Sequence, residues 1–369
     1  MFPCHKQAME ERLSRPEARP GRGAPENRTP TRFGLATREA DGDWLDEREE
    51  LDGEQPLRTT VTVEKPRTII ARNSSPDVGF DRSINPYRGC EHGCIYCFAR
   101  PTHAFHDLSP GLDFETRLFA KPDAARLLRA ELARPGYRCA LIAIGTNTDP
   151  YQPIEGKWRV MRGVLEVLAE TRHPVMITTK SDRVLRDLDL LEPMGRQRLV
   201  GVALSVTSLT PEISRTLEPR APAARKRLAA VKALSAAGVP VSVAIAPVVP
   251  QGTDHELEAI VAAAAEAGAQ RVFYLPVRLP HEVAPLFRAW LDEHYADRAA
   301  KVMHTIQSMR GGKDYDSAWH VRMTGTGPYA ELLRRRFDIA VKKHGLNETR
   351  TTLRTDLFEP PSGPQLKLL

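Results

Sequence analysis

The chain has 369 residues, 41% of them hydrophobic, which is enough for one large α/β core with terminal extensions. Lysine and arginine number 53 against 47 aspartates and glutamates, so the formal charge is +6. This balance permits nucleic-acid binding without requiring it. No apolar run approaches the roughly 18 residues of a membrane span, and no signal-peptide pattern opens the chain, so a membrane-spanning protein is excluded.

Cysteine usage indicates a reducing compartment. Of the five cysteines, three lie close together, and only Cys4 and Cys139 remain, which is too few for a disulfide framework. We therefore expect a soluble cytoplasmic protein with no membrane attachment.

Residues 1–56 are rich in Arg, Pro, Gly and Glu and poor in apolar side chains, so they cannot bury enough surface to offset the loss of chain entropy. We predict a disordered tail there, and a basic arm that touches nucleic acid is the alternative. Ordered structure is expected to begin near the β-branched run at 59–63 and to form one core domain over 57–280.

Short apolar runs alternate with helical patterns from residue 83 onward, which is typical of repeated βα units and a parallel sheet. The six predicted strands are Ser83–Tyr87, Cys139–Gly145, Val175–Thr179, Val200–Val206, Val239–Ala246 and Arg271–Tyr274. The predicted helices between them are Pro122–Ala133, Trp158–Glu170, Ala223–Ala237 and His255–Ala267. Right-handed crossovers would place the carboxyl ends of all six strands on one rim.

Cys90, Cys94 and Cys97 form a C-x3-C-x2-C loop just after the first predicted strand. Thiolates packed this closely repel one another, so a metal or a cluster is the usual reason for such spacing. Three ligands leave one metal with an open coordination position, whereas structural zinc sites and ferredoxin clusters normally use four. The loop therefore indicates catalysis, although unligated structural cysteines are an alternative. Three histidines lie near enough in sequence to complete a Cys3His zinc site instead: His92, His103 and His106.

Tyr96 stands directly before the last cysteine, and the resulting C-x3-C-x-aromatic-C pattern closely resembles the signature loop of the radical SAM superfamily. The flanking residues, Asn-Pro-Tyr-Arg-Gly before the loop and Phe-Ala-Arg-Pro after it, resemble the photolyase-like branch that includes spore photoproduct lyase. The resemblance implies a [4Fe-4S] cluster on the three cysteines, with S-adenosylmethionine on its fourth iron and cleaved to a 5'-deoxyadenosyl radical. It also implies an external electron donor of the flavodoxin or ferredoxin type.

The fold implied by the resemblance is a partial (β/α)6 radical SAM barrel with a disordered N-terminal tail and a helical C-terminal extension over 281–369. Polar residues at the predicted strand ends are then candidates for binding S-adenosylmethionine. The Gly-Gly-Glu motif found after the second strand in many members of the superfamily is absent here. Acceptors for the methionine ammonium group occur in that loop instead: Asn147, Thr148, Asp149 and Glu155.

Other candidates follow the third and fourth strands. Lys180 is placed to pair with the carboxylate of S-adenosylmethionine, and the photolyase-like branch carries a lysine in this place. Ser205 offers a hydroxyl to the ribose or the carboxylate. Arg220 is a second candidate cation, unless Glu218 pairs with it as a loop clamp. Tyr96 completes the candidate cofactor-binding residues.

In the C-terminal extension, the apolar pattern predicts helices over Val283–Tyr295, Arg298–Met309 and Pro328–His344. The last of these carries three consecutive arginines at 334–336. Two functions remain open at this point. The first is a radical SAM enzyme acting on an unknown substrate, with nucleic acid as a candidate. The second is a metal-containing nucleic-acid-binding protein whose cysteine loop is structural.

Spore photoproduct lyases use a cysteine at the end of the second strand to return a hydrogen atom to the product radical. The corresponding position here is near Gly145, and Cys139 stands at the start of the same predicted strand. We therefore expect that this chain does not repair spore photoproduct.

Overall fold

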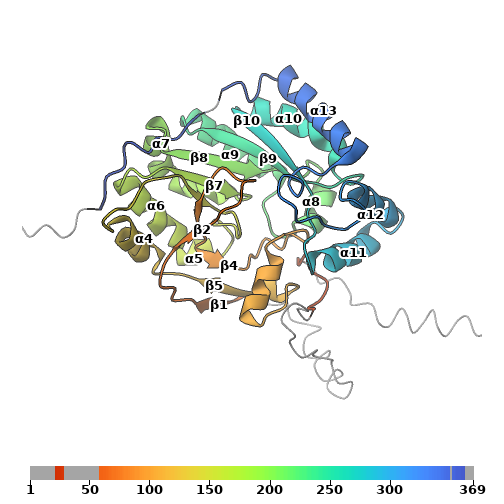
Figure 1. Cartoon of the computed structure of the whole chain (residues 1–369), viewed down its shortest axis with the longest axis horizontal. Helices are drawn as coiled ribbons and strands as arrows, with labels where there is room; N and C mark the ends of the chain where they lie inside the picture. Colours follow the sequence, from red (N-terminus) through yellow and green to blue (C-terminus); the bar gives the residue numbers. More distant parts are fainter. Residues whose placement is uncertain (1–20, 29–57, 350, 362–369) are drawn as a thin grey trace, which may run out of the picture.

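A computed structural model describes residues 21–28, 58–349 and 351–361. Figure 1 shows the chain viewed down its shortest axis, with helices and strands labelled. Its main feature is a seven-stranded sheet in the order β10-β9-β8-β7-β6-β3-β2. All neighbours from β3 to β10 are parallel, and β2 lies antiparallel on β3. The strands are β2 (Ile70–Arg72), β3 (Arg82–Ile84), β6 (Ile142–Ile144), β7 (Val175–Thr179), β8 (Val200–Ser205), β9 (Val241–Val248) and β10 (Arg271–Pro276).

The prediction of six parallel strands in chain order is confirmed, although several strand ends differ from the predicted ones, most of all in the first two strands. The first predicted strand ends at Ile84, because Pro86 has no N–H to continue the ladder, and Tyr87–Arg88 becomes β4 of another sheet. The second begins at Ile142, so Cys139 precedes the strand. The other sheet has the order β1-β5-β4 and contains β1 (Thr60–Val63) and β5 (Arg117–Ala120).

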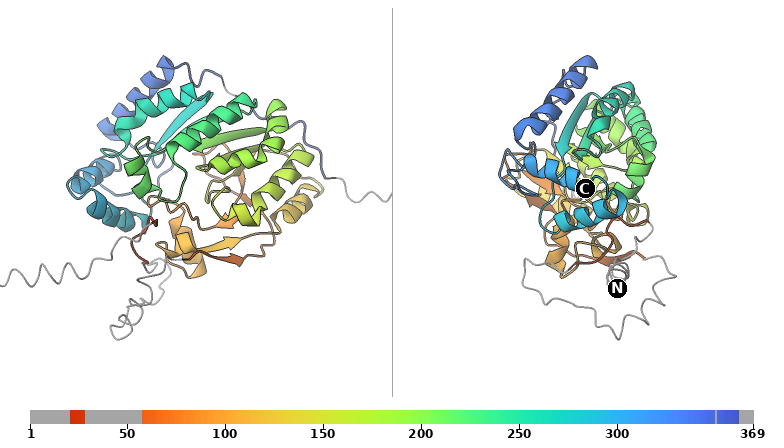
Figure 2. Two further views of the ribbon diagram at one scale, coloured as in Figure 1. Left: turned by 180° about the vertical axis from the view of Figure 1, so that it is seen from behind. Right: turned by 90° about the vertical axis from the view of Figure 1, so that its right-hand side faces the viewer.

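Helices between the strands cover one side of the main sheet (Figure 2). The long ones are α4 (Ala124–Leu132), α6 (Val160–Glu170), α7 (Leu188–Arg196), α9 (Ala224–Ala236) and α10 (Leu257–Glu266). Shorter turns of helix are η3 (Arg100–His106), α3 (Asp113–Thr116), α5 (Glu155–Trp158), η4 (Asp182–Asp187), α8 (Pro211–Leu217) and η5 (Asp254–Glu256). Helix α9 ends where predicted, because Gly238 adopts the left-handed conformation (φ +77°).

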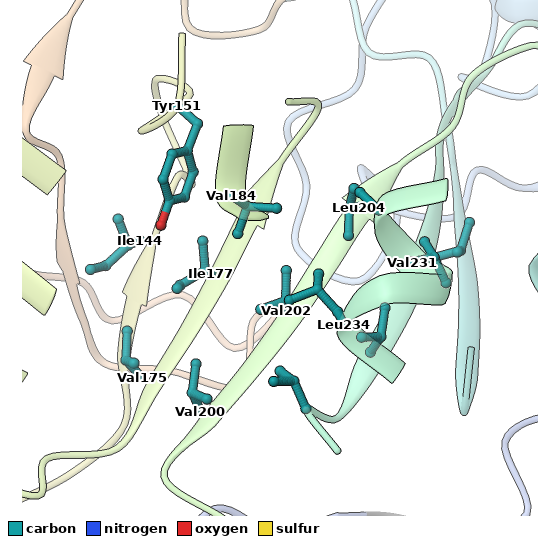
Figure 3. Close-up of a cluster of buried hydrophobic side chains, with 14 of the residues drawn as sticks. Ile144, Tyr151, Val175, Ile177, Val184, Val200, Val202, Leu204, Val231 and Leu234 are labelled. Carbon is teal, nitrogen blue, oxygen red and sulfur yellow. The ribbon is translucent and has the colours of Figure 1, made fainter. Parts of the chain in front are cut away.

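The core lies between the sheet and these helices (Figure 3). Buried valines, isoleucines and leucines of β7 and β8 face Val231 and Leu234 of α9, so the alternate residues of each strand supply the packing surface. At the end of the core near the strand tips, Tyr151 is buried and its hydroxyl donates to Asp187 Oδ2 at 3.0 Å. The core therefore fixes the positions of the strand ends.

The C-terminal helices α11 (Val283–His294), α12 (Ala299–Ser308) and α13 (Gly327–Lys343) agree with the predicted ones. These helices pack against the main sheet and against the cysteine loop. Phe337 of α13 packs on Tyr274 of β10 with ring centroids 4.8 Å apart, and α11 and α12 form one buried cluster with Ile95 and Tyr96 of the cysteine loop. No helix in the described residues combines the length and the apolar character needed to cross a bilayer.

Residues 21–28 fall inside the predicted disordered tail (red in Figure 1), and Gly23, Ala24 and Pro25 among them are buried. The N–H groups of Gly23 and Ala24 donate to the Glu115 carboxylate at 3.0 and 2.8 Å, and Ala24 is almost fully buried. The prediction of disorder is wrong for this short segment. The rest of the predicted tail lies outside the described residues.

Candidate cofactor site at the strand ends

The cysteine loop lies at the carboxyl ends of the parallel strands, where ligands bind in folds of this type. It leaves β4 directly and is held to two neighbouring loops by hydrogen bonds. Ile95 N donates to Leu217 O at 3.1 Å, and Glu91 N donates to Gln152 Oε1 at 3.0 Å. These bonds connect the loop to the segments that follow β8 and β6.

The three thiols are held in a largely dry environment. Cys90 and Cys94 are buried, and Cys97 is half-buried. Burial raises the pKa of Cys94 to about 12 against the lowering effect of Lys180, and burial, Asp149 and the other two thiols raise the pKa of Cys90 well above its ordinary value. Three thiolates here therefore require nearby positive charge.

The donor set fits an iron-sulfur cube better than a single ion. Among the described residues, no group of three Cys, His, Asp or Glu side chains lies closely enough together to hold one metal ion. A cube instead takes each thiolate on a different iron, and its iron supplies the positive charge that the buried thiols lack. The zinc alternative, which needs Cys and His on one ion, has no support in this geometry.

Behind the loop, a buried network joins Tyr96 to β8 and α9. Glu218 accepts hydrogen bonds from the Tyr96 hydroxyl, from Thr207 Oγ1 at 2.6 Å and from Arg227. Burial alone would raise the pKa of Glu218, but Arg227 and Lys180 outweigh it and hold that pKa at about 2. Glu218 is therefore a fixed negative charge beneath the cysteine loop.

Lys180 lies on top of this network at the end of β7. Its ammonium group is 5.8 Å from the centroid of the Tyr96 ring. Burial works to lower the pKa of Lys180, yet Cys94 and Glu218 raise it overall, so the side chain keeps its charge. A lysine held charged beside the cluster loop can attract the carboxylate of a ligand.

The polar side chains of the loop after β6 form more contacts with other protein groups than the sequence predicts. Asp149 accepts from Thr179 Oγ1 and Lys180 N, both at 2.7 Å, and lies 3.4 Å from His92 Nδ1. Burial would raise the pKa of Asp149, but His92 and these hydrogen bonds hold it at about 2. Thr148 donates to Tyr87 O at 3.0 Å. Both side chains therefore bind protein groups in this structure.

Two further acceptors of this loop differ in their availability. The backbone N–H of Asn147 donates to Asn85 Oδ1 at 3.3 Å, and the Asn147 side chain is half-exposed at the rim. Glu155 is fully buried and binds Arg186 at 2.6 Å and Met161 N at 3.0 Å. Glu155 therefore stabilises the start of α6 and does not face the rim.

The two candidate residues after β8, Ser205 and Arg220, lie in different environments. Ser205 is buried at the strand end, where its carbonyl accepts from Arg227 Nη1 at 2.9 Å. Arg220 is half-exposed and pairs with Glu91 at 3.2 Å. The alternative in which Glu218 clamps Arg220 is wrong, because Glu218 pairs with Arg227.

Sequence reasoning missed Arg227 and the structural role of Glu218. Arg227 lies in the first turn of α9 among other basic residues, a pattern that indicates a solvated helix surface, yet it is almost fully buried. Nothing in its local sequence distinguishes it from Arg225, its exposed neighbour. A cavity of about 230 Å³ lies elsewhere, lined mainly by α8, α11 and the loop after β9, and it contains none of the cysteines.

Residues 84–264 match the family model for the radical SAM superfamily. An uncharacterized protein of Mycobacterium tuberculosis is 42% identical over 214 residues, which are 58% of this chain and 63% of the relative. Another, from Methanocaldococcus jannaschii, is 28% identical over 173 residues, or 47% of this chain and 62% of the relative. The match thus spans less than two thirds of the length of these relatives.

Solved structures support the same fold. Spore photoproduct lyase complexed with dinucleoside spore photoproduct aligns with a TM-score of 0.56 at 16% identity, over 77% of this chain and 79% of the lyase. A form of that lyase with bound AdoMet aligns equally well over 84% and 85% of the two chains at 15% identity. The superfamily uses a [4Fe-4S] cluster and S-adenosylmethionine, which agrees with the three-cysteine loop and the charged lysine beside it. Residues 84–264, which carry the three cysteines and Lys180, therefore form a radical SAM domain.

Proposed function

We propose that this chain is an enzyme that cleaves S-adenosylmethionine at a [4Fe-4S] cluster held by Cys90, Cys94 and Cys97. The observation that carries the proposal is the position of the three thiols at the strand ends, beside the charged Lys180. When bound, the cluster and S-adenosylmethionine supply a 5'-deoxyadenosyl radical that starts chemistry on a substrate. An external donor of the flavodoxin or ferredoxin type provides the electron.

The residues of the chain bind and orient the cofactor in this proposal. Lys180 pairs with the methionine carboxylate, and Asn147 presents a half-exposed amide at the same rim. Glu218 holds Tyr96 in place below the cluster loop. Arg220, Ser205, Thr148 and Asp149 support the loops that surround the ligand. The buried setting of Cys90 and Cys94 excludes water from the cluster.

We further propose that the substrate is a nucleic acid or a part of one. The basic charge balance of the chain supports this, and so does the fold that it shares with a lyase solved with a dinucleoside photoproduct. The competing function, a nucleic-acid-binding protein with a structural cysteine site, makes no use of a charged lysine beside the cluster loop.

Anaerobic reconstitution with iron and sulfide, followed by reduction and an assay for 5'-deoxyadenosine, tests the enzyme. We expect a brown protein that forms 5'-deoxyadenosine, and the single changes Cys90→Ala, Cys94→Ala and Cys97→Ala should each lose the chromophore. Cys139→Ala is the matched control, because Cys139 lies before β6 and outside the loop. A protein that binds about one zinc and no iron would show that the cysteine site is structural.

A further inference from the structure

Arg278 is a half-buried cation without a carboxylate partner. It follows β10, and no ion pair involves it in the part of the chain that the structure describes. Its guanidinium instead lies over the ring of Phe98, 4.3 Å from the centroid, and Nη1 is 3.3 Å from the sulfur of Met323. Of the more deeply buried arginines, Arg100 and Arg227 pair with glutamates, and Arg310 donates to backbone carbonyl groups. Arg278 is thus a positive charge that the fold holds in place without neutralising it.

This cation is next to the cluster loop. Phe98 follows Cys97 in the chain, so the guanidinium lies one residue from a cluster ligand. Burial and the charge of Arg322 lower the pKa of Arg278, while Tyr315, Cys97 and Asp77 act in the opposite direction. A ligand that pairs with Arg278 would therefore lie near the reacting centre.

Phe98 presents an exposed aromatic surface at the same place. Its side chain is 43% exposed, although the residues before and after it, Cys97 and Ala99, are half-buried and buried. The guanidinium of Arg278 covers one face of the ring, so another face is available to a second flat group. An exposed ring next to a catalytic loop is more informative than an isolated surface phenylalanine.

The segment 310–326 forms a fixed wall beside this pair. Arg310 donates to Val321 O at 2.8 Å and to Val277 O at 3.3 Å, and Arg322 pairs with Asp77. The same segment carries Trp319, which is 56% exposed. The surface beside Cys97 thus combines one exposed aromatic ring, that of Phe98, with the positive charge of Arg278, and the neighbouring segment is held at Arg310 and Arg322.

We propose that Phe98 and Arg278 bind a nucleobase and its phosphate, and so position a nucleotide substrate beside the cluster. The base stacks on the exposed face of Phe98, and the forked guanidinium pairs with the phosphate oxygens. The inference rests on the proposed radical SAM function and adds the chemical class and the binding residues of the substrate. The same chemistry is offered by a free nucleotide and by a single strand, and the test separates them.

The test measures binding of a fluorescent single-stranded oligothymidine and, by competition, of thymidine monophosphate to the anaerobically reconstituted protein at low salt. Arg278→Gln and Phe98→Ala should each weaken strand binding by at least about tenfold. The plot of log K against log salt should become less steep by about 0.7 for Arg278→Gln, which is the contribution of one phosphate contact on a single strand. Arg271→Gln is the control, because Arg271 is exposed and lies at the opposite end of the same strand.

Two further variants keep the test decisive. Arg278→Lys retains the charge without the fork and should bind with intermediate affinity, and Phe98→Leu keeps an apolar side chain without a stacking face. Tighter binding of the strand than of the monophosphate supports a nucleic-acid substrate, and equal binding supports a free nucleotide. Equal affinity of Arg278→Gln and Arg271→Gln, or no binding by the unchanged protein, would overturn the inference.

The cofactor assay separates this inference from the proposed function. Arg278→Gln should bind S-adenosylmethionine with unchanged affinity, and a loss would assign Arg278 to the cofactor and overturn the inference. Formation of 5'-deoxyadenosine without any binding of strand or monophosphate refutes the nucleotide site and leaves the enzyme function intact. Arg278-dependent strand binding without 5'-deoxyadenosine supports the site and refutes the radical chemistry.

Discussion

The two sides of the cysteine loop differ in how their charges are neutralised. On one side, Arg100 and Glu115 are both fully buried and pair at 2.6 Å, and Gly23 and Ala24 complete the hydrogen bonds of the carboxylate. On the other, Arg278 lies over the ring of Phe98 and near the sulfur of Met323, and it forms no ion pair within the described residues. A buried charge without partners is costly, so the closed side must be paired, whereas the open side retains a cation that a ligand can neutralise.

Removing the buried carboxylate should show the largest effect on stability. Glu115→Gln leaves Arg100 with a neutral partner and should lower the free energy of unfolding by about 3–5 kcal/mol. Glu170→Gln is the control, since Glu170 pairs with Arg129 on the surface and should cost only about 0–1 kcal/mol. Urea unfolding of both variants measures the difference, and equal losses would show that the closed side is no more tightly held than the surface.

The closed side also shows where prediction from sequence stops. The parallel strands were predictable, because their apolar runs and the turns between them are local signals. The contact of residues 21–28 with Glu115 was not, since it joins backbone N–H groups to a carboxylate more than 90 positions away. Gly23 has a role only through space: a Cβ there would lie 1.6 Å from Gly93 O, so the segment approaches the loop only with glycine.

The candidate site likewise contains residues that could be predicted from the sequence and residues that could not. The cysteines and Lys180 could be predicted because motif spacing and a strand end are visible in the chain. The pairing of Glu218 with Arg227 could not, since a buried arginine in a basic helix turn looks the same in sequence as an exposed one. Arg278 and Phe98 are 180 residues apart in sequence, and only the return of β10 to the cysteine loop brings them together.

Lys180 offers the next largest effect, on binding and not on folding. Lys180→Ala should weaken S-adenosylmethionine binding by roughly 10- to 100-fold, the loss of one charge-assisted pair of about 1.5–3 kcal/mol. Its melting temperature should change much less, because the ammonium group forms no ion pair with a protein carboxylate within the described residues. Isothermal titration of the reconstituted protein, with Lys157→Ala as an exposed control, measures the affinity, and equal values would contradict the assignment.

The contribution of the buried Glu218 carboxylate to stability should decrease in acid. The pKa of Glu218 is about 2 in the folded chain, below its ordinary 4.5, so its contribution to stability is present above about pH 5 and is lost as the pH falls toward 2. Glu218→Gln should therefore be less stable than the unchanged protein at pH 7, and the gap should narrow by pH 3. Urea unfolding across this range tests the sign, and a gap that widens in acid would exclude a charged Glu218.

The arginines of α13 should contribute less to nucleic-acid binding than their sequence indicates. Arg336 binds Glu258 at 2.7 Å, and Arg335 lies 3.8 Å from Glu331, so of the three arginines only Arg334 has no ion pair within the described residues. The triple change of all three to Ala should reduce the salt slope of strand binding by at most about one unit. A reduction near three units would mean that the helix is a principal contact, and no change would remove it from the interface.

The smallest expected effect is no effect at all: the reconstituted protein should not convert spore photoproduct to two thymines. Gly145 has a φ of +86°, and a Cβ there would lie 2.0 Å from Thr178 O, so the strand end has no room for the cysteine side chain that a lyase places there. Cys139 precedes β6 near Arg82, at the amino end of the strands and away from the cysteine loop. Anaerobic incubation with a spore-photoproduct dinucleotide and analysis by chromatography checks this expectation. Catalytic conversion would refute it and direct attention to Tyr315, which acts electrostatically on Arg278, as an alternative hydrogen donor.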